Sequence, residues 1–311
     1  MERIKNMFGL DFPVFQGGMA NVATGEFAAA VSNAGAMGII GSGGMDAEQL
    51  QNEIRNCRKA TNRPFGVNIM LMNPHADDLA DLCCEEGVSL ITTGAGNPGK
   101  YIEKWQRAGI KIFPVVSSTA LAIRMERLGV DGIIAEGYES GGHVGELTTM
   151  VLVPQVADAV SIPVVAAGGI AGGKQILAAR ILGACGVQMG TVFLASSECP
   201  VHEEYKKAVL RAKSNDTVVT GRSVNAPVRI IKNQMAREYL KRERAGAQKD
   251  ELEQFTLGSL GRAVREGDVK YGSLMAGQVS GMIREIKPVR EILVQLFEEY
   301  DHELKELCEK A

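Results

Sequence analysis

The chain has 311 residues, of which 45% are hydrophobic and 23% are charged, and its formal net charge is −3. This length fits one large α/β barrel, and the negative charge argues against a protein that holds nucleic acid by bulk positive charge. No apolar run reaches the roughly 18 residues of a membrane span, and residues 1–20 lack the apolar centre of a secretion signal, so we expect a cytoplasmic protein with no membrane or nucleic-acid partner.

The six cysteines and four histidines do not form a metal-binding pattern. No C-x-x-C pair is present, and no two histidines lie at the H-x3–5-H spacing of a zinc site. Cys83 and Cys84 are neighbours and cannot easily form a disulfide with each other. We therefore expect reduced thiols packed as small hydrophobic side chains, and no metal site.

Short apolar runs rich in Val, Ile and Phe recur through residues 1–190, most of them followed by glycine or a polar residue. Runs of this length that are apolar on both faces are typical of buried parallel strands. The eight predicted strands are Pro13–Gln16, Met37–Gly41, Phe65–Met70, Ser89–Thr93, Lys111–Val116, Gly132–Glu136, Pro163–Ala167 and Gly186–Gly190.

Helical stretches separate these runs. Gly25–Asn33 is rich in alanine, and Asp46–Gln49 resembles a capping box that begins a helix reaching Lys59. Asn73 and Pro74 resemble an N-cap followed by a proline in the first helical position. Three further helices are predicted at Ser118–Leu128, Thr149–Val160 and Gly173–Leu182. Eight βα units predict a (β/α)8 TIM barrel, whereas a doubly wound sheet is disfavoured because no G-x-G-x-x-G follows the first strand.

The strand pattern stops near Ser197, and residues 200–270 are charged and helical in pattern. Within them, Gln234–Gln254 reads as a basic helix, a Gly-Ala break and an acidic turn, and the chain ends in a helix at Pro288–Lys310. We therefore expect a TIM barrel formed by residues 1–199 and 272–311, with residues 200–271 inserted as a small helical lid.

Glycines follow the seventh and eighth predicted strands, where the active sites of TIM barrels form. Ala166–Ile170 reads Ala-Ala-Gly-Gly-Ile, and Gln188–Thr191 reads Gln-Met-Gly-Thr. Glycines in such loops expose consecutive backbone N–H groups that bind a phosphate monoester. One such turn could be purely structural, but two at neighbouring strand ends favour a phosphate site.

The other strand ends supply apolar and amide side chains, with no cluster of carboxylates and no Ser–His–Asp order. Met19, Asn68, Gln188 and Met275 suit a flat, uncharged ring system, so we expect FMN or another mononucleotide. His143 lies in a glycine-rich loop at this end of the barrel and is the candidate proton donor or acceptor. The remaining histidines, His75, His202 and His302, are expected to be solvated or to cap helices.

Taken together, these loops resemble the FMN-dependent enoyl-acyl-carrier-protein reductase II family of bacterial type II fatty-acid synthesis, within the superfamily of nitronate monooxygenases and 2-nitropropane dioxygenases. The resemblance covers about residues 3 to 295, lid included, and Asn21 departs from it because these reductases often carry an aromatic residue there. The matching stretches are 15–20, 65–70, 92–98, 135–137, 141–145, 166–170, 187–191, 231–234 and 275–278.

The resemblance implies that NADH or NADPH reduces a trans-2-enoyl thioester on acyl carrier protein through bound FMN. It assigns His143 to the thioester end, where it polarises the carbonyl or protonates the α-carbon. Stimulation by potassium or ammonium is also implied, and we expect a homodimer. The cofactor-binding residues that we predict are Gly17, Gly18, Met19, Asn68, Glu136, Gly142, Ala167, Gly168, Gly169, Gln188, Met189, Gly190, Thr191, Met275 and Gln278.

Two other functions stay open. A nitronate monooxygenase has the same flavin but oxidises a nitronate with oxygen. A barrel of the inosine-monophosphate dehydrogenase kind has similar phosphate loops, but it needs a nucleophilic cysteine between the sixth and seventh strands, and residues 137–162 contain none. A flavin-binding protein without turnover is disfavoured by His143 in the glycine-rich loop.

Residues 229–249 carry an excess of positive charge, with acidic residues only at 238 and 243. Such a run is commonly a solvated helix face, but it could also bind acidic acyl carrier protein or the phosphates of NADH. The seven basic residues are Arg229, Lys232, Arg237, Lys241, Arg242, Arg244 and Lys249.

Overall fold

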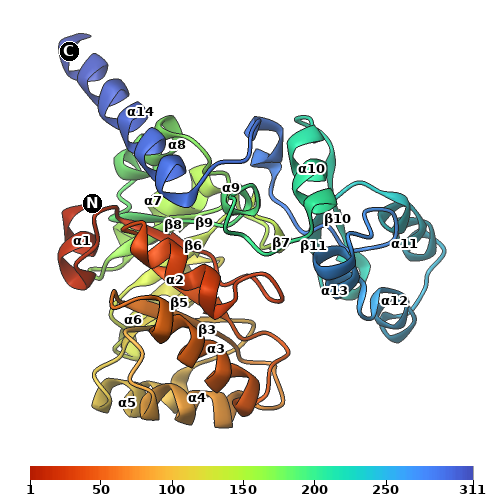
Figure 1. The fold of residues 1–311 in the computed structure, drawn as a ribbon, viewed down its shortest axis with the longest axis horizontal. Coiled ribbons are helices and arrows are strands. Elements are labelled where there is room, and N and C mark those ends of the chain that lie inside the picture. The colour runs from red at the N-terminus through yellow and green to blue at the C-terminus, as the bar shows by residue number, and fades with distance from the viewer. Residues whose placement is uncertain (311) are drawn as a thin grey trace.

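Eight parallel strands form a barrel in the computed structural model, which describes residues 1–310 (Figure 1). Their order is β1-β9-β8-β6-β5-β4-β3-β2, and a parallel bridge between Phe15 and Met37 joins the two end strands. The predicted TIM barrel is therefore confirmed. The strands are β1 (Val14–Gln16), β2 (Gly38–Gly41), β3 (Phe65–Met70), β4 (Leu90–Gly94), β5 (Lys111–Val116), β6 (Ile133–Glu136), β8 (Val164–Ala167) and β9 (Gly186–Met189).

Alternate residues of the strands belong to two separate hydrophobic clusters, as the period-two geometry of a strand requires. Phe15, Ile39 and Phe113 belong to the cluster inside the barrel, which α1 (Glu2–Phe8) closes by packing Phe8 against Phe15 and Phe113 at centroid distances of 5.7 and 5.9 Å. This cluster fills the barrel at its amino-terminal end, so the opposite end is left for a site.

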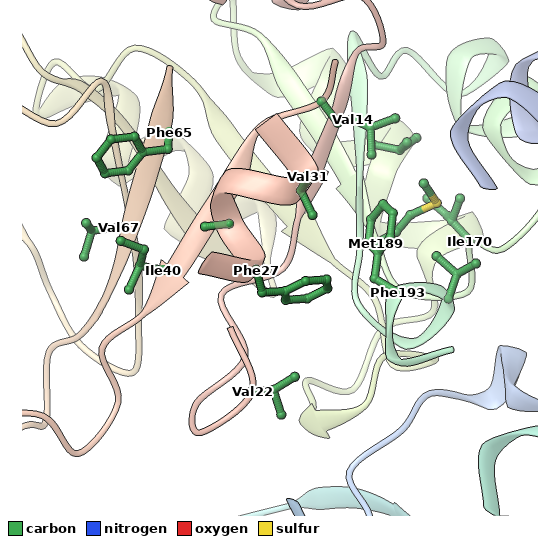
Figure 2. Close-up of a cluster of buried hydrophobic side chains, with 14 of the residues drawn as sticks. Val14, Val22, Phe27, Val31, Ile40, Phe65, Val67, Ile170, Met189 and Phe193 are labelled. Carbon is green, nitrogen blue, oxygen red and sulfur yellow. The ribbon is translucent and has the colours of Figure 1, made fainter. Parts of the chain in front are cut away.

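The outward-facing residues of the strands pack against the surrounding helices. Figure 2 shows Phe27 and Val31 of α2 (Gly25–Asn33) among side chains of this larger cluster. The capping box of α3 (Ala47–Ala60) forms as predicted, with Gln49 N–H donating to Asp46 at 2.9 Å. The other barrel helices are α4 (Ala76–Glu85), α5 (Gly99–Arg107), α6 (Thr119–Arg127), α7 (Thr149–Ala159), α8 (Gly173–Ile181), α9 (Thr191–Leu194) and α14 (Val289–Lys310).

The start of α4 differs from the prediction. His75, and not Asn73, is the residue that precedes the helix, although the Asn73 side chain does accept a hydrogen bond from His75 N–H at 2.9 Å. Asn73 therefore stabilises the turn that leads into α4. His202 precedes α10 and its Nδ1 accepts from Glu204 N–H at 3.2 Å, and His302 lies on α14, so these histidines have the capping and surface positions that we expected.

Residues 200–271 form a separate layer beside the barrel (Figure 1). The expected helices are present, but the segment is not wholly helical, because β10 and β11 pair antiparallel within it. The residues expected to form an acidic turn are instead part of α12, which is a helix. The elements are α10 (Glu203–Arg211), β10 (Thr217–Thr220), η1 (Arg222–Val224), β11 (Val228–Ile231), α11 (Gln234–Arg244), α12 (Lys249–Thr256), α13 (Ser259–Gly261) and the π-helix η2 (Arg262–Glu266).

The chain leaves the barrel and returns to it at adjacent points. Ser196 and Lys287 form a parallel bridge, in which Ser197 N–H donates to Lys287 O at 3.0 Å and Lys287 N–H donates to Ala195 O at 3.2 Å. On the way back, η3 (Gln278–Met282) contacts α9 and α10. Among the helices of residues 1–310, none combines the length and the apolar character needed to cross a bilayer.

Candidate active site

A cavity of about 600 Å³ lies at the carboxyl ends of the barrel strands. Sixteen residues were predicted for the site, and all except Gln278 line this cavity. Gln278 begins η3 and its side chain is exposed, while its backbone N–H donates to Glu139 O at 3.0 Å. The sequence pattern identified the segment correctly, but the cavity is lined there by Met275, Gly277 and Val279.

Two consecutive glycines lie directly after β8, where the sequence predicts a phosphate site. Gly168 and Gly169 have φ angles of +88° and +75°, which favour glycine. A Cβ atom on Gly168 would lie 2.7 Å from Gly137 O, so the two loops approach too closely for a side chain. Within residues 1–310, the N–H groups of Gly168, Gly169 and Ile170 donate no hydrogen bond, and they are therefore available to an anion.

Close packing also fixes the amide side chain on β3. A Cβ atom on Gly18 would lie 2.2 Å from the Cβ of Asn68, so the loop after β1 lies directly against this side chain. The Asn68 Nδ2 donates to Thr92 Oγ1 at 2.9 Å. Asn68 therefore has a fixed orientation at the cavity, and Gln188 and Met19 line the same cavity.

His143 lies on β7 (Gly142–His143), a short strand that the sequence analysis did not predict. Its side chain is accessible from the cavity, but the protein atoms around it lower the pKa of the imidazole by desolvation. The preceding loop is tightly packed, because a Cβ atom on Gly141 would lie 2.6 Å from the backbone of Ala276. At neutral pH, His143 therefore presents a neutral imidazole to the cavity.

Glu136 ends β6 and also faces the cavity, where burial raises the pKa of its carboxyl group to about 7. The hydroxyl of Ser140 lies nearby and opposes this shift, although it forms no hydrogen bond of standard geometry within residues 1–310. Glu136 is therefore able to donate a hydrogen bond into the cavity as a neutral acid.

We expect Glu136→Gln to remove part of the pH dependence of stability. The folded-state pKa of Glu136 lies above its unfolded value, so the wild-type protein loses stability relative to the Gln variant as the pH rises from about 4.5 to about 7. The full difference is on the order of 3 kcal/mol. Urea unfolding of both flavin-free proteins at pH 5 and pH 8 measures it, and parallel pH profiles would contradict the assignment.

Some cavity residues were not predicted. Glu139 accepts hydrogen bonds from the backbone N–H and the hydroxyl of Thr149, at 2.8 and 3.0 Å, which anchors the His143 loop to α7. Tyr205 on α10 is fully buried and donates to Met275 O at 2.8 Å. Val115, Val116 and Ser117 form one wall of the cavity and were also not predicted. The polar pair Ser117-Ser118 after the fifth apolar run could have indicated this wall.

No group of three or more His, Cys, Asp or Glu side chains that could hold a metal ion occurs within the described residues. Asn21, the position that departs from the reductase pattern, has a φ of +61° and accepts a hydrogen bond from Arg265 Nη1 at 3.2 Å. This residue therefore links the loop after β1 to the π-helix η2.

A model of the family described as nitronate monooxygenase matches residues 1–299 of the chain. The chain belongs to the nitronate monooxygenase family. Its sequence is 47% identical to that of FabK from Thermotoga maritima, whose structure is known. The two structures match over 99% of each chain with a TM-score of 0.97. A probable nitronate monooxygenase of Staphylococcus saprophyticus is 32% identical over 91% of this chain and 93% of its own length. A nitroalkane oxidase from Streptomyces ansochromogenes is 27% identical, with a TM-score of 0.87 over 98% of this chain and 99% of its own.

Nitronate monooxygenase family members are FMN-dependent oxidoreductases, and the residues of this cavity fit that cofactor. The free N–H groups of Gly168–Ile170 suit the phosphate of FMN. The Ser140 hydroxyl, which is buried among the lining residues and has no hydrogen-bond partner within the described residues, suits the hydroxylated chain that joins the phosphate to the ring. Asn68 and Gln188 supply amides for the ring. Each part of the mononucleotide therefore has matching chemistry in the cavity.

Proposed function

We propose that the chain is an FMN-dependent enoyl reductase, which uses NADH or NADPH to reduce trans-2-enoyl groups on acyl carrier protein in bacterial type II fatty-acid synthesis. The observation that supports this most strongly is the 47% identity to FabK over 99% of both chains, which includes residues 200–271. The identity to the probable nitronate monooxygenase is lower, at 32%.

The shape of the cavity supports the same proposal. Beyond the residues that suit FMN, the cavity continues along the ends of β3–β5, where its lining is mostly apolar. Met70, Val116 and Leu121 lie on this side. Transfer of an aliphatic chain from water to such a surface lowers the free energy. A small nitronate has no long chain that would occupy this part of the cavity.

In the proposed mechanism, FMN would supply the hydride transfer from the nicotinamide to the β-carbon of the enoyl group. Gly168, Gly169 and Ile170 would hold its phosphate through their N–H groups, while Asn68 and Gln188 would orient its ring. His143 would donate an imidazole N–H to the thioester oxygen, where negative charge develops as the β-carbon accepts hydride. The resulting enolate would then take a proton from water at its α-carbon, which gives the saturated thioester. The closely packed loops around Gly18 and Gly141 fix these groups relative to one another.

The decisive experiment compares substrates on the purified, flavin-loaded protein. NADH or NADPH consumption that depends on crotonyl thioester in the absence of oxygen supports the reductase. Turnover of an alkyl nitronate with oxygen, together with no response to the thioester, refutes it.

Nitronate monooxygenase is the second candidate, because the family model that matches residues 1–299 has that description and the Streptomyces relative is a nitroalkane oxidase. The neutral imidazole of His143 can also accept a proton from a nitroalkane.

The proposal includes a surface for acyl carrier protein on α11. Arg237, Lys241 and Arg244 are exposed, lie at helical spacings of four and three residues, and form no ion pair within residues 1–310. Arg242 is not part of this surface, since it pairs with Glu238 at 3.3 Å and stacks 4.2 Å from the Phe255 ring. Arg229 is 3% exposed and is also excluded.

Reversing Arg237, Lys241 and Arg244 to Glu should raise KM for a carrier-bound enoyl substrate about tenfold at low salt, because charge steering of the acidic carrier is lost. KM for the corresponding coenzyme A thioester should change much less, and 0.5 M salt should remove the difference. Equal changes for both substrates would show that α11 is only a solvated face.

We also propose that the enzyme acts in the cytoplasm as a homodimer and that potassium or ammonium stimulates it. Light scattering of the purified protein tests the dimer. Replacing potassium by sodium in the assay tests the cation effect.

A further inference from the structure

The loop that carries His143 leaves the barrel and joins the sheet of residues 200–271. In this loop, β7 pairs antiparallel with β11, so that Arg229 lies opposite Gly142 and Val228 lies opposite His143. Val144 N–H donates to Pro227 O at 3.2 Å, and Tyr138 N–H donates to Leu147 O at 2.7 Å and closes the base of the loop. The position of His143 over the cavity therefore depends on β11 as well as on the barrel.

The side chain of Arg229 binds the first residue of the same loop. Its Nε and Nη2 donate to Tyr138 O at 3.3 and 3.0 Å, and its Nη1 donates to Thr217 Oγ1 at 3.1 Å. Its guanidinium carbon lies 4.5 Å from the centre of the Tyr138 ring. The loop is thus held at Tyr138 by a side chain and at Gly142–His143 by the backbone of the same strand.

This guanidinium is buried without an opposite charge. Arg229 is 3% exposed, and none of the ion pairs within residues 1–310 includes it. Burying an unpaired charge is unfavourable, and a neutral side chain could fill the same space. The retained charge therefore points to a task that needs the planar, forked donor set of arginine.

We propose that Arg229 is a positioning residue, which holds Tyr138 against β11 and thereby fixes the imidazole of His143 over the reacting end of the cavity. This inference rests on the proposed function, since it takes His143 to act on the thioester. Arg229 touches neither the cavity nor a substrate, because it is absent from the cavity lining. Its effect is transmitted through the loop of residues 138–147.

The neighbouring Arg222 provides a matched control. It also binds Tyr138, through a hydrogen bond to the phenol oxygen and a contact of 5.3 Å to the ring centre. However, Arg222 is exposed and does not contact the backbone of the loop. Arg222→Met therefore removes a positive charge beside Tyr138 without releasing the loop.

The experiment measures both half-reactions of the flavin-loaded protein by stopped flow, in wild type, Arg229→Lys, Arg229→Met and Arg222→Met. A displacement of about 1 Å at a reacting group can reduce a rate about 100-fold. We expect thioester-dependent reoxidation to slow at least about tenfold in Arg229→Lys and more in Arg229→Met, since lysine cannot reproduce the forked contact. Bleaching by NADH should stay within about twofold of wild type in every variant, and Arg222→Met should match wild type throughout. Equal slowing of both half-reactions, or a wild-type rate in Arg229→Lys, would overturn the proposal.

Thr217→Val keeps the test informative if Arg229→Met does not fold. This substitution removes only the hydroxyl that accepts from Arg229 Nη1. It should therefore slow thioester-dependent reoxidation, but less than Arg229→Lys does. An unchanged rate in both Thr217→Val and Arg229→Lys would overturn the proposal.

A second readout does not depend on the thioester reaction. Histidine resonances in NMR report the pKa of His143, which the surrounding protein lowers in the wild type, and the spectrum of His143→Gln identifies its signal. Arg229→Lys keeps the positive charge but loosens the loop, so greater solvation should raise the pKa of His143 towards its ordinary value. An unchanged pKa would overturn the inference. Failure of the wild-type protein to reduce thioesters would instead refute the proposed function, and the NMR comparison would still decide the role of Arg229.

Discussion

Replacing His143 by alanine should separate the two half-reactions of the enzyme. The variant should retain FMN and bleach with NADH at nearly the wild-type rate, because nicotinamide oxidation needs no proton from a side chain. Reoxidation by crotonyl thioester should slow about 100-fold or more, since a positioned acid or hydrogen-bond donor is worth 10²–10⁴-fold in such a step. This factor corresponds to about 3–5 kcal/mol of barrier.

Stopped-flow absorbance measures both steps on one preparation, and reoxidation by oxygen should change little. His143→Gln is the informative companion, because its amide can still donate a hydrogen bond to the thioester oxygen and should recover part of the rate. If flavin reduction slows as much as thioester-dependent reoxidation, His143 shapes the flavin pocket and does not serve the substrate.

Replacing Gly169 by valine should give a folded, colourless protein. Gly169 has a φ of +75°, and a Cβ atom there would lie 3.3 Å from the Glu139 side chain, at the edge of the proposed phosphate site. A β-branched side chain in this conformation is strained by about 1–3 kcal/mol and crowds the N–H groups that would bind the phosphate. We therefore expect loss of flavin and of all activity, measured as absorbance per protein after gel filtration.

Gly109→Val is the matched control for this variant. Gly109 has nearly the same φ, +74°, but no atom lies within 4 Å of a Cβ built there, and it is not part of the cavity lining. It should carry a similar backbone strain and retain FMN. Stoichiometric flavin in Gly169→Val would show that the phosphate is held elsewhere.

The barrel and the cavity at the carboxyl ends of its strands could be predicted because their signals are local. Each buried strand is a short apolar run, and glycines follow both β8 and β9, as expected for loops that expose backbone N–H groups. The chain order of eight such units then determines which loops meet at one end. For this reason, nearly all of the predicted site residues line one cavity.

The features that were missed depend on contacts between distant segments. Two residues, Gly142 and His143, form a strand only because β11 lies beside them, and no pattern of two residues predicts that. Arg229 was counted with the basic surface because charge usually indicates exposure, yet it is buried under the His143 loop. Glu139 was overlooked because its partner Thr149 belongs to the next helix.

The adjacency of Ser196 and Lys287 has an evolutionary consequence. Because Ser196 and Lys287 are neighbours in a parallel bridge, the segment between them begins and ends at the same place on the barrel. The entropy lost on closing such a loop depends only weakly on the length of the loop. The segment between them is therefore suited to replacement by a different inserted domain on the same barrel. Two requirements limit such a replacement: the new segment must present an edge strand to Gly142 and His143, and it must rebuild the part of the cavity wall that Met275, Gly277 and Val279 form.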